Sequence, residues 1–184
     1  MRALSLLALS GILAGLTSAW VEAADADFKL EPGFTLLLNG KDLTGWKTKK
    51  GGESLDGKDE AYGKRFVVKD GKLVIDPAVK GDVIIETAKQ FKDVHIKFDF
   101  MPGKACNNDL FLRGQKFDLT LKNKGVKENE WNQFEIIVAG DKAEFKSNGE
   151  SQRMAKPGEA ATPFGIRAEF GNIEFKNVRF KEGS

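Results

Sequence analysis

Apolar and polar residues alternate along most of this chain once an apolar leader has passed. In the stretch VHIKFDFM, residues 94–101, apolar side chains occupy the even positions before the last residue, and His95, Lys97 and Asp99 occupy odd ones. Successive side chains of a β-strand point to opposite faces, so this period-two pattern predicts half-buried strands. The apolar spacing typical of helices is nearly absent beyond the leader, which indicates an all-β protein.

Short turn signals separate the alternating runs. Each pairs glycine with Asn or Asp between two β-rich segments, and the clearest are Asp70-Gly71, Gly140-Asp141, Asn148-Gly149 and Gly171-Asn172. Such pairs favour tight hairpins, so neighbouring strands should be antiparallel. The chain also holds 14 Phe, many inside alternating runs, where their rings can fill the space between two stacked sheets. The pattern predicts a single-domain antiparallel β-sandwich or jelly roll.

The leader has the features of a signal peptide over residues 1–23. Arg2 precedes an apolar segment too short to span a bilayer, and Val21-Glu22-Ala23 resembles a signal peptidase site. We therefore expect residues 24–184 to form the mature domain, exported to the periplasm or the exterior. No second apolar run of membrane length follows, so no membrane partner is expected after cleavage.

Composition narrows the chemistry. A net charge of +2, from 29 basic and 27 acidic side chains, gives no strong field for nucleic acid. One His and one Cys exclude a His-rich zinc site and a thiolate cluster, and they exclude an internal disulfide. Cys106 is expected to be partly buried and inert. Residues 47–65 are polar and glycine-rich and are expected to form a long surface loop.

Strand alternation places a set of polar side chains on outward faces: His95, Asp99, Arg113, Asp118, Arg167 and Glu169. If their strands share one sheet, these groups form one surface. Carboxylates and guanidinium groups suit sugar hydroxyls because they make paired hydrogen bonds, and paired carboxylates also supply acid and base for glycoside cleavage. The alternative is an ordinary solvated sheet face, stabilised by cross-strand charge pairs.

Several motifs carry a family resemblance. They are GFTLLLNGKDLTGWK from residue 33, the Asp70-Gly71 hairpin, KFDF, NNDLFLRG, NEWNQFEIIVAGDKAEFKSNG and the closing FGIRAEFGNIEFKNVRFKE. In this order they resemble the 3-keto-disaccharide hydrolase domain family over residues 33–182. The resemblance implies an exported concanavalin A-like jelly roll that acts on carbohydrate and cleaves glycosides already oxidised to a 3-keto sugar.

The resemblance also implies roles for particular residues. Asp118 would be the base or acid, Asp99 its partner and Arg113 the clamp on the enolate or a hydroxyl. Asn108, Arg167, Glu169 and His95 would contact the sugar, although His95 is also read as a plain outward strand residue. Some relatives use a divalent metal as the electrophile, so the cofactor is left open.

The chain departs from the family pattern at several motif positions. Asp109-Leu110 stand where relatives have Ser-Gly, Asp118 is a shortened carboxylate, and no His follows Phe170. An alternative is therefore a carbohydrate-binding jelly roll without turnover, with Trp46, Tyr62 or Phe111 stacking on sugars. Trp131 is expected in the core.

Overall fold

The computed structural model describes residues 28–183, so the predicted signal peptide lies outside the described residues. Within this range the chain forms fourteen strands and no helix, which confirms the all-β prediction. The strands are β1 (Thr35–Leu36), β2 (Trp46–Thr48), β3 (Glu60–Ala61), β4 (Phe66–Lys69), β5 (Lys72–Ile75), β6 (Val83–Phe91), β7 (Val94–Pro102), β8 (Asn107–Leu112), β9 (Gln115–Thr120), β10 (Asn132–Ala139), β11 (Lys142–Ser147), β12 (Glu150–Ala155), β13 (Thr162–Phe170) and β14 (Ile173–Glu182).

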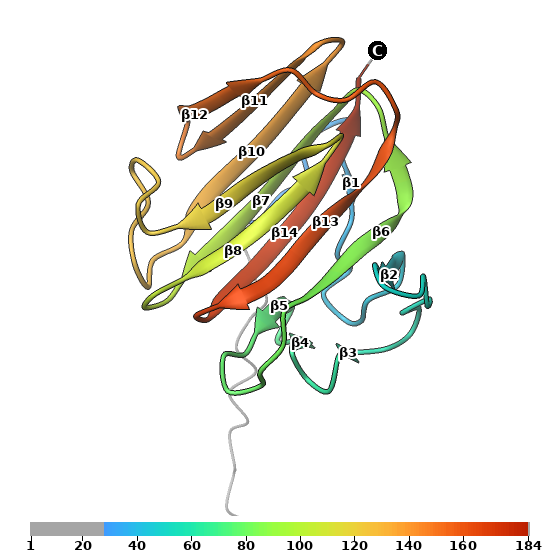
Figure 1. Cartoon of the computed structure of the whole chain (residues 1–184), viewed down its shortest axis with the longest axis vertical. Coiled ribbons are helices and arrows are strands. Elements are labelled where there is room, and N and C mark those ends of the chain that lie inside the picture. The colour runs from blue at the N-terminus through green and yellow to red at the C-terminus, as the bar shows by residue number, and fades with distance from the viewer. Residues whose placement is uncertain (1–27, 184) are drawn as a thin grey trace, which may run out of the picture.

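The strands form two antiparallel sheets that stack as a sandwich (Figure 1). The nine-stranded sheet has the order β12-β11-β10-β7-β14-β5-β4-β3, with β1 also paired to β14. The five-stranded sheet has the order β2-β6-β13-β8-β9. Strands that are distant in sequence are thus neighbours in the sheet: β13 pairs with β6 on one side and with β8 on the other. The jelly-roll-like sandwich agrees with the predicted architecture.

Three of the four predicted hairpins are present. Asp70 and Gly71, with φ of 51° and 77°, join β4 to β5, and Asn148 and Gly149, with φ of 49° and 81°, join β11 to β12. Positive φ at both central residues is the type I′ geometry, whose twist matches that of the flanking strands. The Gly140-Asp141 turn likewise joins β10 to β11. The fourth predicted hairpin is wrong: Gly171-Asn172 carry the chain from β13 in the five-stranded sheet to β14 in the nine-stranded sheet, and these two strands do not pair.

The core lies between the sheets and is rich in phenylalanine. Phe98 of β7 lies 6.4 Å from Phe164 of β13, and Phe134 of β10 lies 5.0 Å from Phe117 of β9, measured between ring centroids. These contacts join one sheet to the other, and aromatic pairs at such spacing add to the area that they bury. Trp131 does not belong to this core: it is 39% exposed, and the Lys176 ammonium lies 4.2 Å from its ring centroid.

The polar segment 47–65 is folded against the five-stranded sheet. A bridge joins Lys47 to Ser54, Leu55 is buried, and the Tyr62 hydroxyl donates to the Ile84 carbonyl at 3.1 Å. The prediction of a surface loop is thus only partly right, because the segment begins in β2 and also contains β3, which pairs with β4 at the edge of the nine-stranded sheet. Over residues 28–183 no helix is long and apolar enough to cross a membrane.

Candidate functional site

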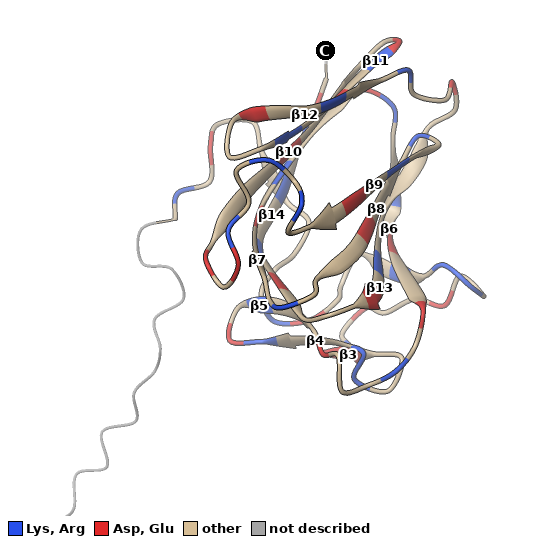
Figure 2. Ribbon diagram, turned by 60° about the vertical axis from the view of Figure 1, so that its left-hand side comes forward, with Lys and Arg blue, Asp and Glu red and all other residues tan. Residues whose placement is uncertain are grey.

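A row of charged residues crosses the outer face of the five-stranded sheet. Strand register places Arg167 of β13 beside Asp109 of β8, and Asp109 beside Asp118 of β9. Acidic positions on neighbouring strands β8 and β9 are visible in Figure 2. Three of the side chains therefore meet because adjacent antiparallel strands present opposed residues on the same face.

Asp109 is the buried member of this row. Its side chain is 0% exposed, and Oδ2 accepts hydrogen bonds from Arg167 Nη1 at 2.6 Å and Lys116 Nζ at 3.4 Å. Its other oxygen, Oδ1, has no partner within residues 28–183. Burial raises the pKa of Asp109, since desolvation disfavours the charged form.

The pKa values of Asp109 and Asp118 are shifted in opposite directions. A hydrogen bond from Asp109 lowers the pKa of Asp118, and contact with Asp118 raises that of Asp109 further. Two carboxyl groups so close titrate as a pair, and the proton stays on the more buried one. These directions favour Asp118, which faces solvent, as the ionised carboxylate of the pair.

Lys116 completes the solvent-facing part of the site. Its Nζ lies 2.5 Å from Asp118 Oδ1, and both side chains are about half exposed. The hydrogen bond to Asp118 raises the pKa of Lys116, so the ammonium persists above neutral pH. A base and a cation thus stand side by side on β9, two residues apart.

Arg167 ties the row to β6. Its Nε and Nη2 donate to the two carboxylate oxygens of Asp82, each at 2.6 Å, and its Nη2 lies 3.2 Å from Glu169 Oε1. The bonds to Asp82 and Asp109 raise the pKa of Arg167 above its ordinary range. Bidentate guanidinium–carboxylate pairs fix geometry as well as charge, so Arg167 holds the carboxylates in place.

A pocket of about 750 Å³ opens on this face. It is lined by residues of β8, β9 and β13 and of adjoining loops: Ala105, Cys106, Asn107, Lys116, Asp118, Thr120, Leu121, Lys122, Asn123 and Glu169. The predicted site residues Asp118 and Glu169 therefore share one cavity, and Arg167 contacts Glu169 directly. Cys106 is buried at its floor, and burial raises the pKa of the thiol to about 11, so the thiol is inert as predicted.

Arg113 does not face Asp118, contrary to the sequence prediction. Arg113 and Gly114 are the turn between β8 and β9, with φ of 48° and 73°. The guanidinium is buried and donates to the carbonyls of Gly158 at 2.8 and 2.5 Å, Lys92 at 3.0 Å and Gly140 at 3.3 Å, and to Asp93 Oδ1 at 3.2 Å. It joins loops at one end of the sandwich.

Asp99 and His95 also lie away from the site. Both belong to β7 of the nine-stranded sheet and point outward there, on the opposite side of the molecule from Asp118. Asp99 accepts from Asn177 Nδ2 at 2.7 Å. His95 Nε2 lies 2.7 Å from Glu135 Oε2, and burial lowers the pKa of His95. Strand alternation predicts correctly that these side chains point outward, but it does not tell which of the two sheets their strand joins.

Asn108 is buried between the sheets and does not face the pocket. Its Oδ1 accepts from the Glu169 backbone N–H at 2.9 Å, and its Nδ2 donates to the Phe170 carbonyl at 3.0 Å. The register of β13 against β8 shifts between Arg167 and Phe170. Asn108 therefore bonds the backbone of a bulge that carries Glu169.

The described residues do not fit a bound divalent metal. Over residues 28–183 no group of three or more His, Cys, Asp or Glu is placed to hold a metal ion. Arg167 and Lys116 already neutralise the carboxylates of this face.

Sequence reasoning missed Asp109 and Lys116. Strand alternation could have found both residues. Asp109 lies two positions before the outward Phe111 in β8, and Lys116 lies two positions before the outward Asp118 in β9, so each shares an outward face. Asp109 had been regarded only as a departure from a family motif.

Comparison with known proteins agrees with this fold. Residues 33–127 match the profile of the 3-keto-alpha-glucoside-1,2-lyase-like domain family. No curated protein matches the chain significantly.

Solved structures with the same fold include proposed glycosyl hydrolases. One from Parabacteroides distasonis has a TM-score of 0.67 at 21% identity, covering 83% of this chain and 94% of that one. A second from the same organism has a TM-score of 0.59 at 15% identity, with 82% and 99% covered. The carbohydrate-binding module CBM66 from Bacillus subtilis has a TM-score of 0.54 at 12% identity, with 76% and 96% covered.

Proposed function

The chain belongs to the 3-keto-alpha-glucoside-1,2-lyase-like domain family, and from this premise we propose that it cleaves 3-keto-glycosides on the outer face of its five-stranded sheet. The family and the fold together support a carbohydrate-active role. The observation that carries the proposal is the Asp109–Asp118 pair, in which a buried carboxyl with a raised pKa lies opposite an exposed carboxyl with a lowered pKa, and the exposed carboxyl lies beside an ammonium group.

The reaction needs a base first. A ketone at carbon 3 acidifies the hydrogen at carbon 2, and Asp118 is the ionised group in the pocket that can accept that proton. The electron pair moves to the carbonyl oxygen, where the Lys116 ammonium stabilises the enolate charge. Expulsion of the group at carbon 1, with a proton from water to its oxygen, leaves an unsaturated sugar, and water then adds across the double bond.

Asp109 acts through Asp118 and does not touch the substrate. It is fully buried, so it is a positioning residue that keeps the pKa of Asp118 low. Arg167 holds Asp109 in turn, while Glu169 lies on the pocket wall, where its carboxylate can accept a sugar hydroxyl hydrogen bond. We further propose that the protein is exported, on the strength of the signal-peptide pattern in residues 1–23.

A second candidate is carbohydrate binding without turnover. The charges of this face are mutually paired, Arg167 with Asp82 and Lys116 with Asp118, and a paired base is a weaker one. Phe111 lies on this face with the Lys49 ammonium 5.3 Å from its ring centroid, which offers an apolar surface for a sugar ring.

The test is turnover of a 3-keto-glucoside by the mature protein and by two matched variants. Asp118→Asn should reduce kcat by at least about a hundredfold, the typical contribution of general base catalysis. Asp99→Asn makes the same chemical change on the other sheet and should leave kcat within about twofold. Saturable sugar binding that Asp118→Asn weakens, without turnover by the wild type, would favour the binding module. If Asp118→Asn and Asp99→Asn lowered kcat equally, the active site could not be assigned to the face of the five-stranded sheet.

A further inference from the structure

A second pocket adjoins the carboxylate site at the end of β13. It has a volume of about 420 Å³, and its lining includes Arg65, Val79, Asp82, Glu169 and Phe170. Glu169 lines both pockets, and Arg167 bonds both to Asp82 here and to Asp109 in the neighbouring site. A molecule bound at Asp118 can therefore extend into this second pocket.

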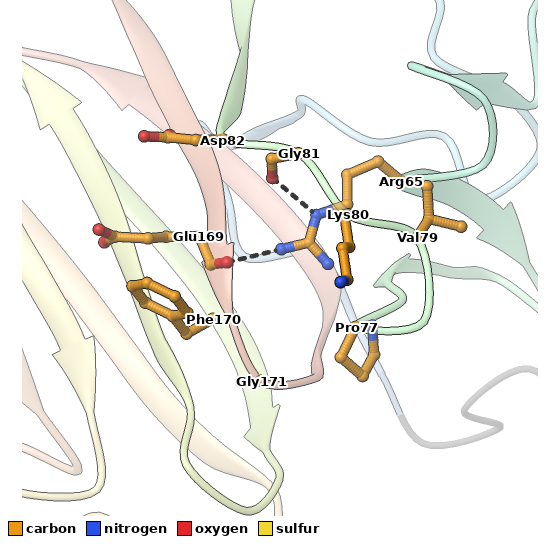
Figure 3. Close-up of a pocket in the computed structure, with 9 residues that line it drawn as sticks. All are labelled: Arg65, Pro77, Val79, Lys80, Gly81, Asp82, Glu169, Phe170 and Gly171. Carbon is orange, nitrogen blue, oxygen red and sulfur yellow. Dashed lines mark hydrogen bonds between the residues drawn. The ribbon is translucent and has the colours of Figure 1, made fainter.

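The backbone that forms the pocket wall is held by two buried polar side chains. Asn108 bonds the Glu169 N–H and the Phe170 carbonyl from one side. Arg65 bonds the Glu169 carbonyl at 2.9 Å and the Gly81 carbonyl at 3.2 Å from the other, as the dashed lines in Figure 3 show. Burying an amide and a guanidinium is costly unless their hydrogen bonds are made, and here those bonds fix a bulge in β13.

The bulge presents Phe170 to solvent. Alternation along β13 would turn Phe170 inward after outward Glu169, but the register shift lets both side chains lie on the same side, together with Asp82 (Figure 3). Phe170 is 60% exposed, and Pro77 and Val79 also line the pocket. The buried hydrogen bonds of Asn108 and Arg65 therefore hold the Phe170 ring in a solvent-exposed position beside the pocket.

The polar groups of the pocket are mostly committed to one another. Asp82 and Glu169 are paired with Arg167, and the Arg65 guanidinium bonds backbone carbonyls. The ammonium of Lys80 makes no hydrogen bond or ion pair within the described part of the chain. A ligand therefore meets an aromatic ring, two aliphatic side chains and one cation, and not the dense array of donors and acceptors that sugar hydroxyls need.

We propose that this pocket is a leaving-group subsite that takes an aromatic aglycone, stacked on Phe170 with the Lys80 ammonium near its ring. Offset stacking and cation–π contact are the interactions that these residues offer. The inference rests on the proposed function, because it assumes that the sugar ring lies beside Asp118.

The test compares two substrates that share one sugar: phenyl 3-keto-glucoside and a 3-keto-disaccharide. Phe170→Ala should lower kcat/KM for the phenyl substrate about tenfold, mainly through KM, and leave the disaccharide within about twofold. Trp131→Ala is the matched control, since Trp131 is an exposed aromatic outside this pocket. Phe170 is exposed, so its loss should not impair folding, which circular dichroism checks.

A binding measurement separates this inference from the proposed reaction. Calorimetry with unoxidised phenyl glucoside should show a dissociation constant about tenfold weaker for Phe170→Ala than for the wild type and the Trp131→Ala control. If no 3-keto-glycoside is turned over but this difference appears, the reaction is wrong and the aromatic subsite stands. The subsite is overturned if both substrates are turned over and Phe170→Ala changes kcat/KM equally for both or for neither. It is also overturned if phenyl glucoside does not bind to the wild type.

Discussion

Replacing Asp109 by Asn tests whether the buried carboxyl holds a proton. The Asp109 carboxyl is fully buried, one of its oxygens accepts a hydrogen bond from Arg167, and its other oxygen has no hydrogen-bond partner among residues 28–183. A proton on the carboxyl would allow a hydrogen bond to Asp118. Asn is nearly isosteric and supplies both a donor for Asp118 and an acceptor for Arg167. We expect Asp109→Asn to change the free energy of unfolding by less than about 1 kcal/mol at pH 5, whereas Asp109→Ala should cost about 2–4 kcal/mol through a lost charged hydrogen bond and a cavity.

The pH dependence makes the test sharper. The pKa of Asp109 is raised in the folded state, so between the unfolded value near pH 4 and the raised value the folded chain binds more protons. The contribution of Asp109 to wild-type stability therefore falls as pH rises through this window, by up to about 1.4 kcal/mol for each pH unit. An amide at this position does not titrate and has no such penalty, so Asp109→Asn should gain stability relative to the wild type from pH 5 to pH 8.

Urea denaturation at pH 5, 6.5 and 8 measures this difference. His95 titrates in the same window, but it does so in both proteins and cancels in the difference. A stability difference that stays constant from pH 5 to pH 8 would refute the shared proton, because Asp109 would then be ionised throughout. Removal of the proton donor should also raise the pKa of Asp118, so Asp109→Ala should shift the acid limb of the kcat profile to higher pH.

Three further predictions concern the scaffold. Arg113→Lys keeps the charge but cannot reproduce the forked contacts to Gly158, so urea denaturation should show a loss of about 2–3 kcal/mol, with sugar affinity unchanged in calorimetry. His95→Gln should remove a contribution to stability that rises with pH up to about 6.5, because the lowered folded pKa of His95 means that the unfolded chain binds the extra proton; thermal melts of both proteins from pH 5 to pH 7 measure the difference. Gly171→Ala should lower the melting temperature clearly, since φ is +69° and a Cβ would lie 2.7 Å from the Cys106 nitrogen, whereas Gly149→Ala, with positive φ and open space, should cost only about 1 kcal/mol.

Strand alternation predicted much of the fold because the rule is local. It placed the apolar side of β7 in the core and put Asp118, Arg167 and Glu169 on outward faces, where the structure brings them together. It failed at Arg113 because Arg113-Gly114 is itself a two-residue turn, in which the side chain leaves the pleat. Positive φ at a non-glycine residue is uncommon, so a sequence pattern gives little warning of it.

The remaining errors come from information that is not local. Whether β7 and β9 share a sheet depends on pairings between distant strands, and β7 pairs with β10 and β14 in the other sheet. Asp99 and His95 were therefore assigned to a surface that they do not reach. The bulge in β13 depends on Asn108, about sixty residues earlier in the chain, so no pattern within β13 predicts that Phe170 points outward.

The two outer faces of the sandwich differ in how they use charge. On the nine-stranded sheet the charged groups near His95 are held in pairs, with Glu135 against His95 and Glu31 against Arg179 at 2.6 Å. On the five-stranded sheet the buried carboxyl of Asp109 has one oxygen, Oδ1, without a hydrogen-bond partner among residues 28–183. A purely structural pair has no need of that arrangement, because Asn would fill the position with less desolvation cost. The buried carboxyl of Asp109 therefore supports the proposal that proton chemistry takes place at Asp118, on this face of the sandwich.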